Sequence, residues 1–116
     1  MKTYLDVFTG SAEAMARWQA LSEAEREACH AAGLKAWGAW VAEHASSIVD
    51  RGSPLGRTKK VSQAGIADIR NQLAAYAVVR APSHEAAARL FEGHPHFTLF
   101  PGEGVEVMEC LPIPGA

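Results

Sequence analysis

The stretch Tyr4-Leu5-Asp6-Val7-Phe8 decides the fold of this 116-residue chain. Its apolar side chains alternate along the backbone, and it stops at Thr9-Gly10-Ser11, a run that favours a turn. We therefore predict a strand, with Leu5 and Val7 on one side and Tyr4 and Phe8 on the other. A strand that is apolar on both sides is typical of a sheet covered on both faces.

Helical and strand patterns alternate along the rest of the chain. A short helical piece is expected from Ala12 to Ala20, and Ser22 with Glu25 matches a capping box that begins a long helix ending near His44. The later elements are a brief strand at residues 47–50 that ends in the turn-rich stretch 52–56, a strand at 73–80, a helix from Ser83 to near Gly93, and a strand at 105–111.

The order of these elements is strand, helix, strand, strand, helix, strand. This is the order of a ferredoxin-like sandwich (βαββαβ), so we predict an α+β fold with a four-stranded antiparallel sheet. Residues 57–72 lie outside the pattern. They contain the basic piece Arg57-Thr58-Lys59-Lys60-Val61 and the stretch 65–69, and they form either an extra hairpin or an irregular excursion.

The second face of the predicted sheet is also apolar. Two helices cover only one face of such a sheet. On the last strand, however, Val105 and Val107 point to one face and Met108 to the other, so both faces carry apolar side chains, as they do on the first strand. Soluble proteins rarely expose a large apolar patch, so we predict a homodimer through this sheet face. The alternative is that residues 12–20 or 57–72 fold over it.

Length and charge exclude several classes of protein. A chain of 116 residues is the size of one domain, and we expect a single domain over residues 1–116. Its 11 Lys and Arg against 13 Asp and Glu give a net charge of −2, without a basic stripe, so no nucleic acid partner is expected. No stretch approaches the roughly 20 apolar residues of a membrane span, and no signal peptide is visible. We expect a cytoplasmic protein with no membrane partner.

The two cysteines, Cys29 and Cys110, form no disulfide framework and no zinc pattern. We interpret both as reduced, small packing residues. Neither lies beside a visible base, and no serine lies in a nucleophile elbow, so the sequence does not favour nucleophilic catalysis.

The stretch His94-Pro95-His96-Phe97 places two of the five histidines in a rigid loop between the second helix and the last strand. Imidazole is the side chain most easily poised for proton transfer near neutral pH. We predict His94 or His96 as the proton-transfer group. The alternative is that both rings are solvated or only cap the second helix.

Topology predicts which groups join these histidines. In a βαββαβ sandwich the ends of the first two strands and the starts of the last two lie at one edge of the sheet. Polar groups at residues 9–11, 50–51, 68–72 and 94–100 should therefore converge. A carboxylate beside an imidazole orients it and raises its basicity, so Asp50 or Asp68 is the predicted partner, with Asn71 and Phe97 nearby.

A stripe on the long helix predicts the wall of a pocket for a planar ligand. Its members share helical spacing and are His30, Gly33, Trp37, Trp40 and His44. Tryptophan provides a large flat surface, and Tyr76 on a neighbouring strand adds a further ring. The alternative is that the stripe simply packs on the sheet, with His44 at the helix end as the exception.

The histidines also suggest a metal site. His-x-His is a common ligand spacing, and His44 is a candidate third ligand. However, zinc and iron sites need a third ligand placed with similar care, and Glu27-x-x-His30 comes too early on the helix. We therefore expect no metal and no cofactor.

Several stretches resemble one family. A glycine and Pro54-Leu55 follow the short second strand, and the later stretches are Ala75-Tyr76-Ala77-Val78-Val79-Arg80-Ala81, Ser83-His84-Glu85-Ala86-Ala87 and Val105-Glu106-Val107-Met108 before a proline. Together they resemble the YCII-related family of dimeric α+β barrels, over most of the chain. In one subgroup Asp-Gly-Pro-Phe precedes the third strand, whereas this chain has no proline in residues 65–72.

The resemblance implies a ferredoxin-like subunit and a homodimer whose sheets face one another. Many relatives are uncharacterised, a few act on aromatic or chlorinated rings, and a His with an Asp is their proposed active pair. Three functions follow as hypotheses. The first is a small cofactor-independent enzyme in which a histidine moves a proton on a planar, aromatic substrate. The others are a binding module for a small metabolite and a structural dimer.

Overall fold

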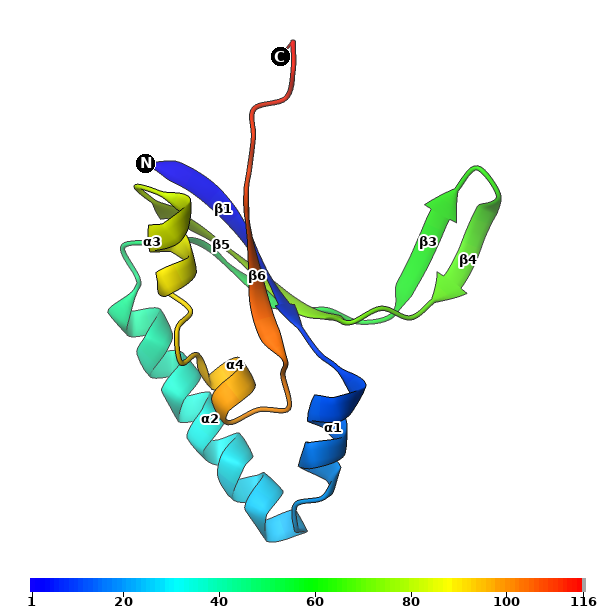
Figure 1. The fold of residues 1–116 in the computed structure, drawn as a ribbon, viewed down its shortest axis with the longest axis vertical. Helices are drawn as coiled ribbons and strands as arrows, with labels where there is room; N and C mark the ends of the chain where they lie inside the picture. Colours follow the sequence, from blue (N-terminus) through cyan, green and yellow to red (C-terminus); the bar gives the residue numbers. More distant parts are fainter. Residues whose placement is uncertain (116) are drawn as a thin grey trace.

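The computed structural model describes residues 1–115 and contains a four-stranded sheet, four helices and a separate hairpin (Figure 1). The elements in chain order are β1 (Lys2–Thr9), α1 (Ala12–Gln19), α2 (Glu23–Glu43), β2 (Ile48–Pro54), β3 (Thr58–Ser62), β4 (Gly65–Ile69), β5 (Leu73–Ala81), α3 (His84–Arg89), α4 (Pro95–Thr98) and β6 (Gly104–Glu109). Within the described residues, no helix is both long and apolar enough to cross a membrane.

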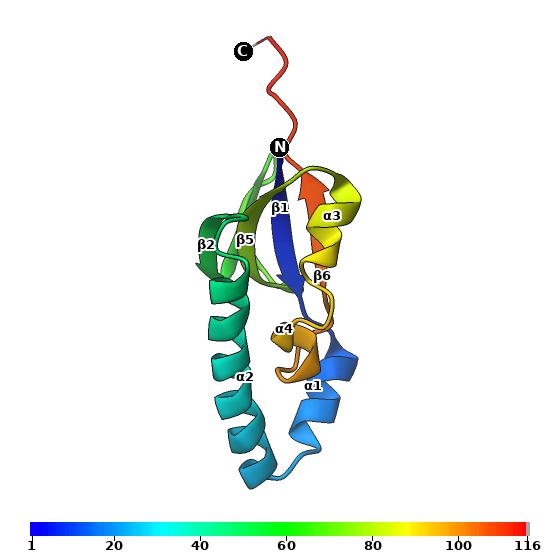
Figure 2. The same cartoon turned by 90° about the vertical axis from the view of Figure 1, so that its left-hand side faces the viewer.

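The main sheet has the strand order β2-β5-β1-β6, and each neighbouring pair is antiparallel. This is the order of a ferredoxin-like sandwich, so the predicted fold class is confirmed. Figures 1 and 2 show α2, α3 and α4 on one side of the sheet. The central strand β1 pairs on both sides, which fixes the direction of every side chain along it.

Side chains on β1 divide between a covered face and an open face, as the alternation predicts. Tyr4 and Phe8 face the helices and are 0% and 1% exposed. They form the core with Val79 and Trp40. The open face carries the side chains opposite to these, which are Leu5 and Val7 on β1, Tyr76 and Val78 on β5, and Met108 on β6.

The long helix begins and ends where its sequence predicts. Ser22 and Glu25 form both hydrogen bonds of the capping box, and the backbone N–H of His44 closes the last turn on the carbonyl of Trp40. Gly33 lies on the face toward α4, because a Cβ there would approach the ring of Phe100 to 2.5 Å. The absence of a side chain at Gly33 therefore allows close packing of this ring on α2.

Two element ends and one predicted loop differ most from the prediction. Strand β2 continues to Pro54, whereas we predicted a turn from Gly52, because Gly52 adopts φ +69° and lets the strand pass through an irregular register. Helix α3 ends at Arg89, short of Gly93. The predicted loop at 94–97 contains the short helix α4, which His94 caps.

Residues 58–69 form the hairpin β3–β4, so the hairpin alternative for this region is correct. Figures 1 and 2 place it away from the helices, beyond the opposite side of the sheet, and it stands clear of the four-stranded sheet. Helix α1 lies at the lower end of the molecule beside α2 and α4. Neither segment covers the open face.

Gly52 provides a test of the β2 geometry. An alanine Cβ there would lie 1.7 Å from the carbonyl oxygen of Tyr76, in a backbone conformation that favours glycine. We expect Gly52→Ala to lower the free energy of unfolding by about 2 kcal/mol or more. The matched control is Gly38→Ala at an exposed position of α2, where a Cβ would meet nothing within 4 Å. This control should raise the free energy of unfolding by roughly 0.5–1 kcal/mol. Equal urea midpoints for the two variants would contradict this geometry.

Candidate functional site

The histidines and tryptophans meet in a ring cluster between the sheet and the helices. The imidazole of His94 packs edge-on against Trp37, Trp40 and Phe8, with ring centroids 4.5, 4.7 and 5.1 Å away. Trp40 also lies 5.2 Å from the ring of His44. Because Trp37 and His44 are only half-buried, the cluster reaches the surface along α2.

His96 links α4 to the end of β1 by a hydrogen bond. Its Nε2–H donates to the carbonyl of Thr9 at 2.8 Å, and its backbone carbonyl accepts from Gly102. A Cβ at Gly102 would lie 2.3 Å from His96 Nε2, so only glycine leaves room for this ring. His96 therefore has a positioning role, because its Nε2 is committed to the backbone.

His94 is held as a hydrogen-bond donor. Its Nδ1 accepts the backbone N–H of His96 at 3.0 Å, and a neutral imidazole then carries its proton on Nε2. The side chain is 1% exposed, and Nε2 has no partner among the described residues. A buried donor without an acceptor is costly, and such a group calls for an explanation, of which a functional role is one.

Asp6 presents the complementary acceptors. It lies on the covered face of β1 between Tyr4 and Phe8 and is 0% exposed. Its neighbours across the ladders are Ala77 and Val107, whose side chains have no polar groups. Both carboxyl oxygens are consequently without partners in the part of the chain that the structure describes.

Tyr4 adds a third unpartnered group to this layer. Its hydroxyl is buried without a hydrogen bond among residues 1–115, while its ring stacks on His84 at 5.4 Å. His84 is itself fixed by a 2.7 Å bond to the carbonyl of Val107. Along β1 the covered face thus runs from Tyr4 through Asp6 to Phe8, whose ring contacts His94, and successive positions on it lie about 7 Å apart.

Burial shifts the pKa values of these groups in opposite directions. It raises the pKa of Asp6 from 3.8 to about 7. Burial, aided by the nearby imidazoles of His96 and His44, lowers the pKa of His94 from 6.5 to about 4. Burial also lowers the pKa of His96, against the bond to Thr9 and the carboxylate of Glu103. Near pH 7 the site therefore holds a neutral imidazole donor and a carboxyl group that readily gains or loses a proton.

The predicted pairs between these histidines and Asp50 or Asp68 are not formed. Asp50 is exposed in the middle of β2, where its carboxylate accepts from the backbone of Gly52 at 2.8 Å. Asp68 lies on β4 and pairs with Lys59 at 2.7 Å. Strand β2 runs past the edge where we expected Asp50, and the hairpin carries Asp68 away from the helices (Figure 1).

The predicted ligand-binding residues are divided between three places. Trp37, Trp40 and His44 belong to the ring cluster. Tyr76 lies on the open face of the sheet, and the Asn71 amide donates to Thr58 at the base of the hairpin. Phe97 is 37% exposed and lines a small concavity between α1 and α4.

Asp6 and Tyr4 were not predicted as site residues. The alternation along Tyr4-Leu5-Asp6-Val7-Phe8 already places Asp6 on the same side as two large aromatic rings. A carboxylate at a core position of a strand is the signal that could have identified it, because unpaired charges are rarely buried.

Two concavities lie outside the ring cluster. The larger measures about 960 Å³ at the base of the hairpin, and the smaller about 220 Å³ between α1 and α4. In residues 1–115, no three His, Cys, Asp or Glu side chains are grouped so that they could hold a metal ion.

Comparison with known proteins gives a structural likeness. No protein-family profile matches the chain, and no curated protein sequence matches it. Among solved structures, the 5-chloro-2-hydroxyhydroquinone dehydrochlorinase of Burkholderia phenoliruptrix, in complex with 2,5-dihydroxybenzoquinone, is similar with a TM-score of 0.53. The match covers 94% of this chain and 93% of that one at 14% identity, and it supports the fold. Membership of the YCII-related family stays a prediction.

The opposite pKa shifts predict an unusual dependence of stability on pH. Between pH 3.8 and about 7 the folded state holds the Asp6 proton more tightly than the unfolded chain, so this contribution is lost as pH rises. Between 6.5 and about 4 the unfolded chain binds the His94 proton more tightly, so that contribution is lost as pH falls. The two effects oppose each other over most of this range.

Asp6→Asn should expose the histidine effect alone. At about 1.4 kcal/mol per pKa unit, we expect the free energy of unfolding of the variant at pH 8 to exceed that of the wild type by up to about 4 kcal/mol. It should then lose stability steeply below pH 6.5. Urea unfolding from pH 4 to pH 8 measures both changes. Asp68→Asn, at an exposed site, is the control and should follow the wild type; an unchanged profile for Asp6→Asn would contradict the burial of Asp6.

Proposed function

We propose that this protein is a small enzyme that moves a proton on a planar, oxygen-bearing ring, using its own side chains and no cofactor. The observation that carries the proposal is that two buried groups of complementary character have no partner among the described residues, the Nε2–H of His94 and the carboxyl oxygens of Asp6, and that Phe8, on the same face of β1 as Asp6, contacts the ring of His94. A ligand with one acceptor and one donor, or an acidic hydrogen, would satisfy both.

Asp6 is the proposed proton-transfer group. A general acid or base works best with a pKa near the working pH, and burial raises the pKa of Asp6 to about 7. In its ionised form Asp6 takes a proton from a ring carbon or hydroxyl, and the electron pair moves onto the substrate oxygen. Return of the proton from Asp6 to another position completes an isomerisation.

His94 is proposed to stabilise the oxygen that gains negative charge. The backbone N–H of His96 donates to Nδ1, so His94 offers Nε2–H, and Nδ1 cannot take up a proton without losing that hydrogen bond. A neutral imidazole donor in a dry site is an effective partner for such an oxyanion. These roles reverse the expectation from sequence, in which a histidine moved the proton and an aspartate oriented it.

The aromatic rings support a planar substrate. Trp37, Trp40 and Phe8 surround His94 with flat apolar surfaces, which favour ring ligands that bring few charges. The structural neighbour is named for its action on a chlorinated hydroquinone and is bound to a quinone. That likeness lends support to ring substrates for this chain.

We also propose that the protein works as a homodimer through the open face of the sheet. The supporting observation is the apolar set of Leu5, Val7, Tyr76, Val78 and Met108, the last of which is 42% exposed. A second copy packed there would remove this surface from water.

Proton exchange tests the proposed chemistry. We expect the wild type in D₂O to accelerate exchange of the ring hydrogens of 2,5-dihydroxybenzoquinone, followed by ¹H NMR. Asp6→Asn should bind the quinone but lose roughly 10²-fold or more of the exchange rate, the usual contribution of a general base. Asp68→Asn is the charge-matched control and should keep the wild-type rate.

Other results of the same experiments would distinguish an enzyme from a metabolite-binding module. Binding in a thermal-shift assay without exchange by the wild type would favour a metabolite-binding module. Equal exchange rates for wild type and Asp6→Asn would contradict the role of Asp6. If no ring compound binds the wild type or raises its melting temperature, the enzyme proposal fails.

A further inference from the structure

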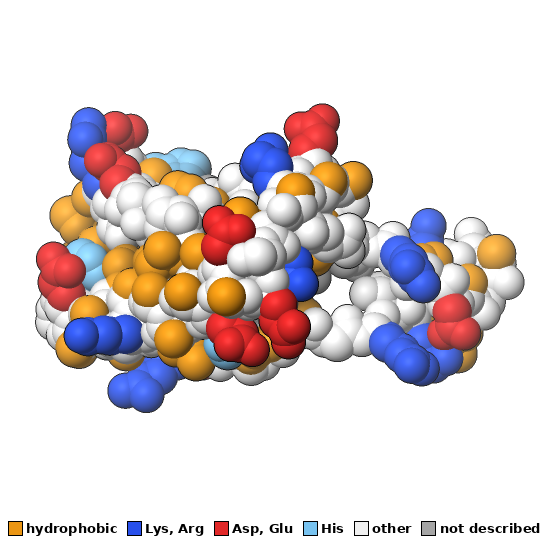
Figure 3. Space-filling view, turned by 90° about the horizontal axis from the view of Figure 1, so that it is seen from below, with side chains coloured by type: hydrophobic (Ala, Val, Ile, Leu, Met, Phe, Trp, Pro, Cys, Tyr) orange, Lys and Arg blue, Asp and Glu red, His pale blue; other side chains and the backbone are white. Residues whose placement is uncertain are grey.

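The β3–β4 hairpin differs in charge from the rest of the chain. Residues 56–72 hold four basic side chains and one acidic side chain, a net charge of +3, although the whole chain carries −2. The remaining residues therefore carry a net charge of −5, from 7 basic and 12 acidic side chains. Figure 3 shows the Lys and Arg side chains on the hairpin, separate from the body.

The hairpin also presents an unburied apolar pair. Val61 and Ile66 lie directly opposite each other in the register and are 75% and 72% exposed. A two-stranded hairpin alone is marginally stable in water, and three or more strands or a packed surface are normally needed. Within one copy the hairpin is held by its own ladder and by the ion pair between Lys59 and Asp68.

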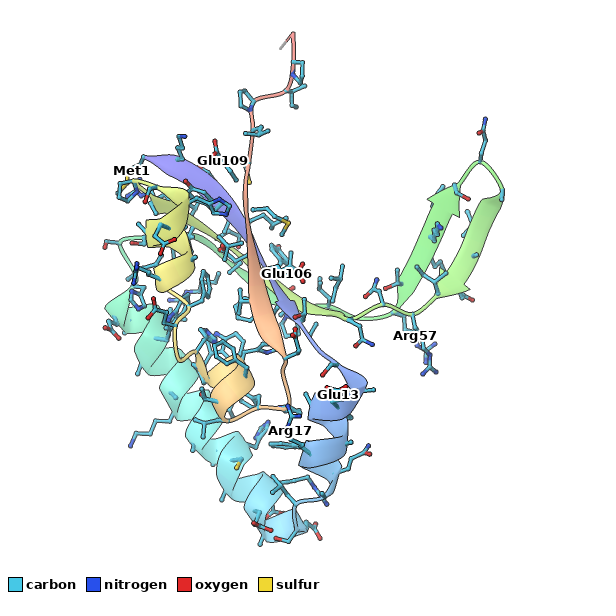
Figure 4. All side chains as sticks on the ribbon, in the orientation of Figure 1. Met1, Glu13, Arg17, Arg57, Glu106 and Glu109 are labelled. Carbon is cyan, nitrogen blue, oxygen red and sulfur yellow. The ribbon has the colours of Figure 1, made fainter. Side chains whose placement is uncertain are left out.

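The hairpin lies on the same side of the sheet as the open face. Figures 1 and 2 agree that it projects on the side of the sheet opposite to the helices, which is the side of the open face. At its base, Arg57, Lys59 and Arg70 line the concavity of about 960 Å³. The open face carries the carboxylates of Glu106 and Asp50, and Figure 4 shows Glu106 on β6 and Arg57 at the hairpin base.

We propose that the hairpin is an arm that clasps a second copy of this chain, with its basic side chains on the acidic body of the partner. Each copy has one basic arm and one acidic body, so a two-fold dimer brings together complementary charges twice. The partner's surface also covers Val61 and Ile66. This inference rests on the proposed sheet-face homodimer, but not on the proposed chemistry.

Cross-linking between isotopically distinct copies tests the arm directly. Wild-type ¹⁴N and ¹⁵N protein are mixed, equilibrated and treated with a carbodiimide, which joins a lysine to a carboxylate in contact. We expect mixed-isotope peptides that link Lys59 or Lys60 to carboxylates outside residues 56–72. The Lys59–Asp68 link within one hairpin is the internal control. Mixed dimers without any link from the hairpin would overturn the proposal.

Charge reversal measures how much the basic side chains of the hairpin contribute to the stability of the dimer. Arg57→Glu/Lys60→Glu leaves the Lys59–Asp68 pair intact, and we expect it to raise the dimer dissociation constant at least roughly tenfold in sedimentation equilibrium. The control is Arg17→Glu/Lys35→Glu, which makes the same charge change on exposed helix positions and should leave the constant unchanged. Equal constants for both variants would overturn the arm while leaving the sheet-face dimer in place.

Two further outcomes contradict the proposal in different ways. A wild-type monomer at every concentration would overturn both the arm and the sheet-face dimer. A monomer that binds a random-sequence DNA duplex, with loss of binding in Arg57→Glu/Lys60→Glu, would assign the basic hairpin to nucleic acid. Neither result changes the proton-exchange experiment, which reports on Asp6.

Discussion

The side-chain alternation of β1, fixed by its pairing with β5 and β6, is the constraint on which the rest of the structure depends. A slip of one residue would exchange the two faces. In the observed register, the aromatic rings of Tyr4 and Phe8 anchor the core while Leu5 and Val7 are left on the open face. The same register places the carboxylate of Asp6 beside Ala77 and Val107, whose side chains cannot hydrogen-bond to it.

Burial then determines the chemistry that each group can perform. Desolvation disfavours the charged form of any group, so it raises the pKa of an acid and lowers that of a base. The pKa of Asp6 is thereby raised to about 7, while His94 is held as the neutral imidazole. The bond from the backbone of His96 selects the tautomer of His94. In the proposed mechanism, two residue types that usually act as base and orienting group exchange these roles.

Much of the fold could be predicted from the sequence, because short-range rules determine it. The capping box at Ser22, the alternation on the strands and the order of elements follow from local patterns. The site could be predicted only in part. Trp37 and Trp40 lie on one face of the long helix as helix spacing predicts, although their contact with His94 was not predicted, and Asp68 is displaced because the 57–72 region forms a hairpin that leaves the sheet. Asp6 could not be predicted as a site residue from local patterns, because a strand carboxylate normally faces water and its burial depends on helices far away in the chain.

The central claim is that β1 holds an unpaired carboxyl group in the dry layer between the sheet and the helices. The most direct measurement is the ¹³C NMR chemical shift of the Asp6 carboxyl carbon, followed from pH 3 to pH 9 and assigned by its absence in Asp6→Asn. The account predicts a single titration with a midpoint near 7. A midpoint at the ordinary value of 3.8 would contradict it, because that carboxylate would then be solvated or paired in the folded protein.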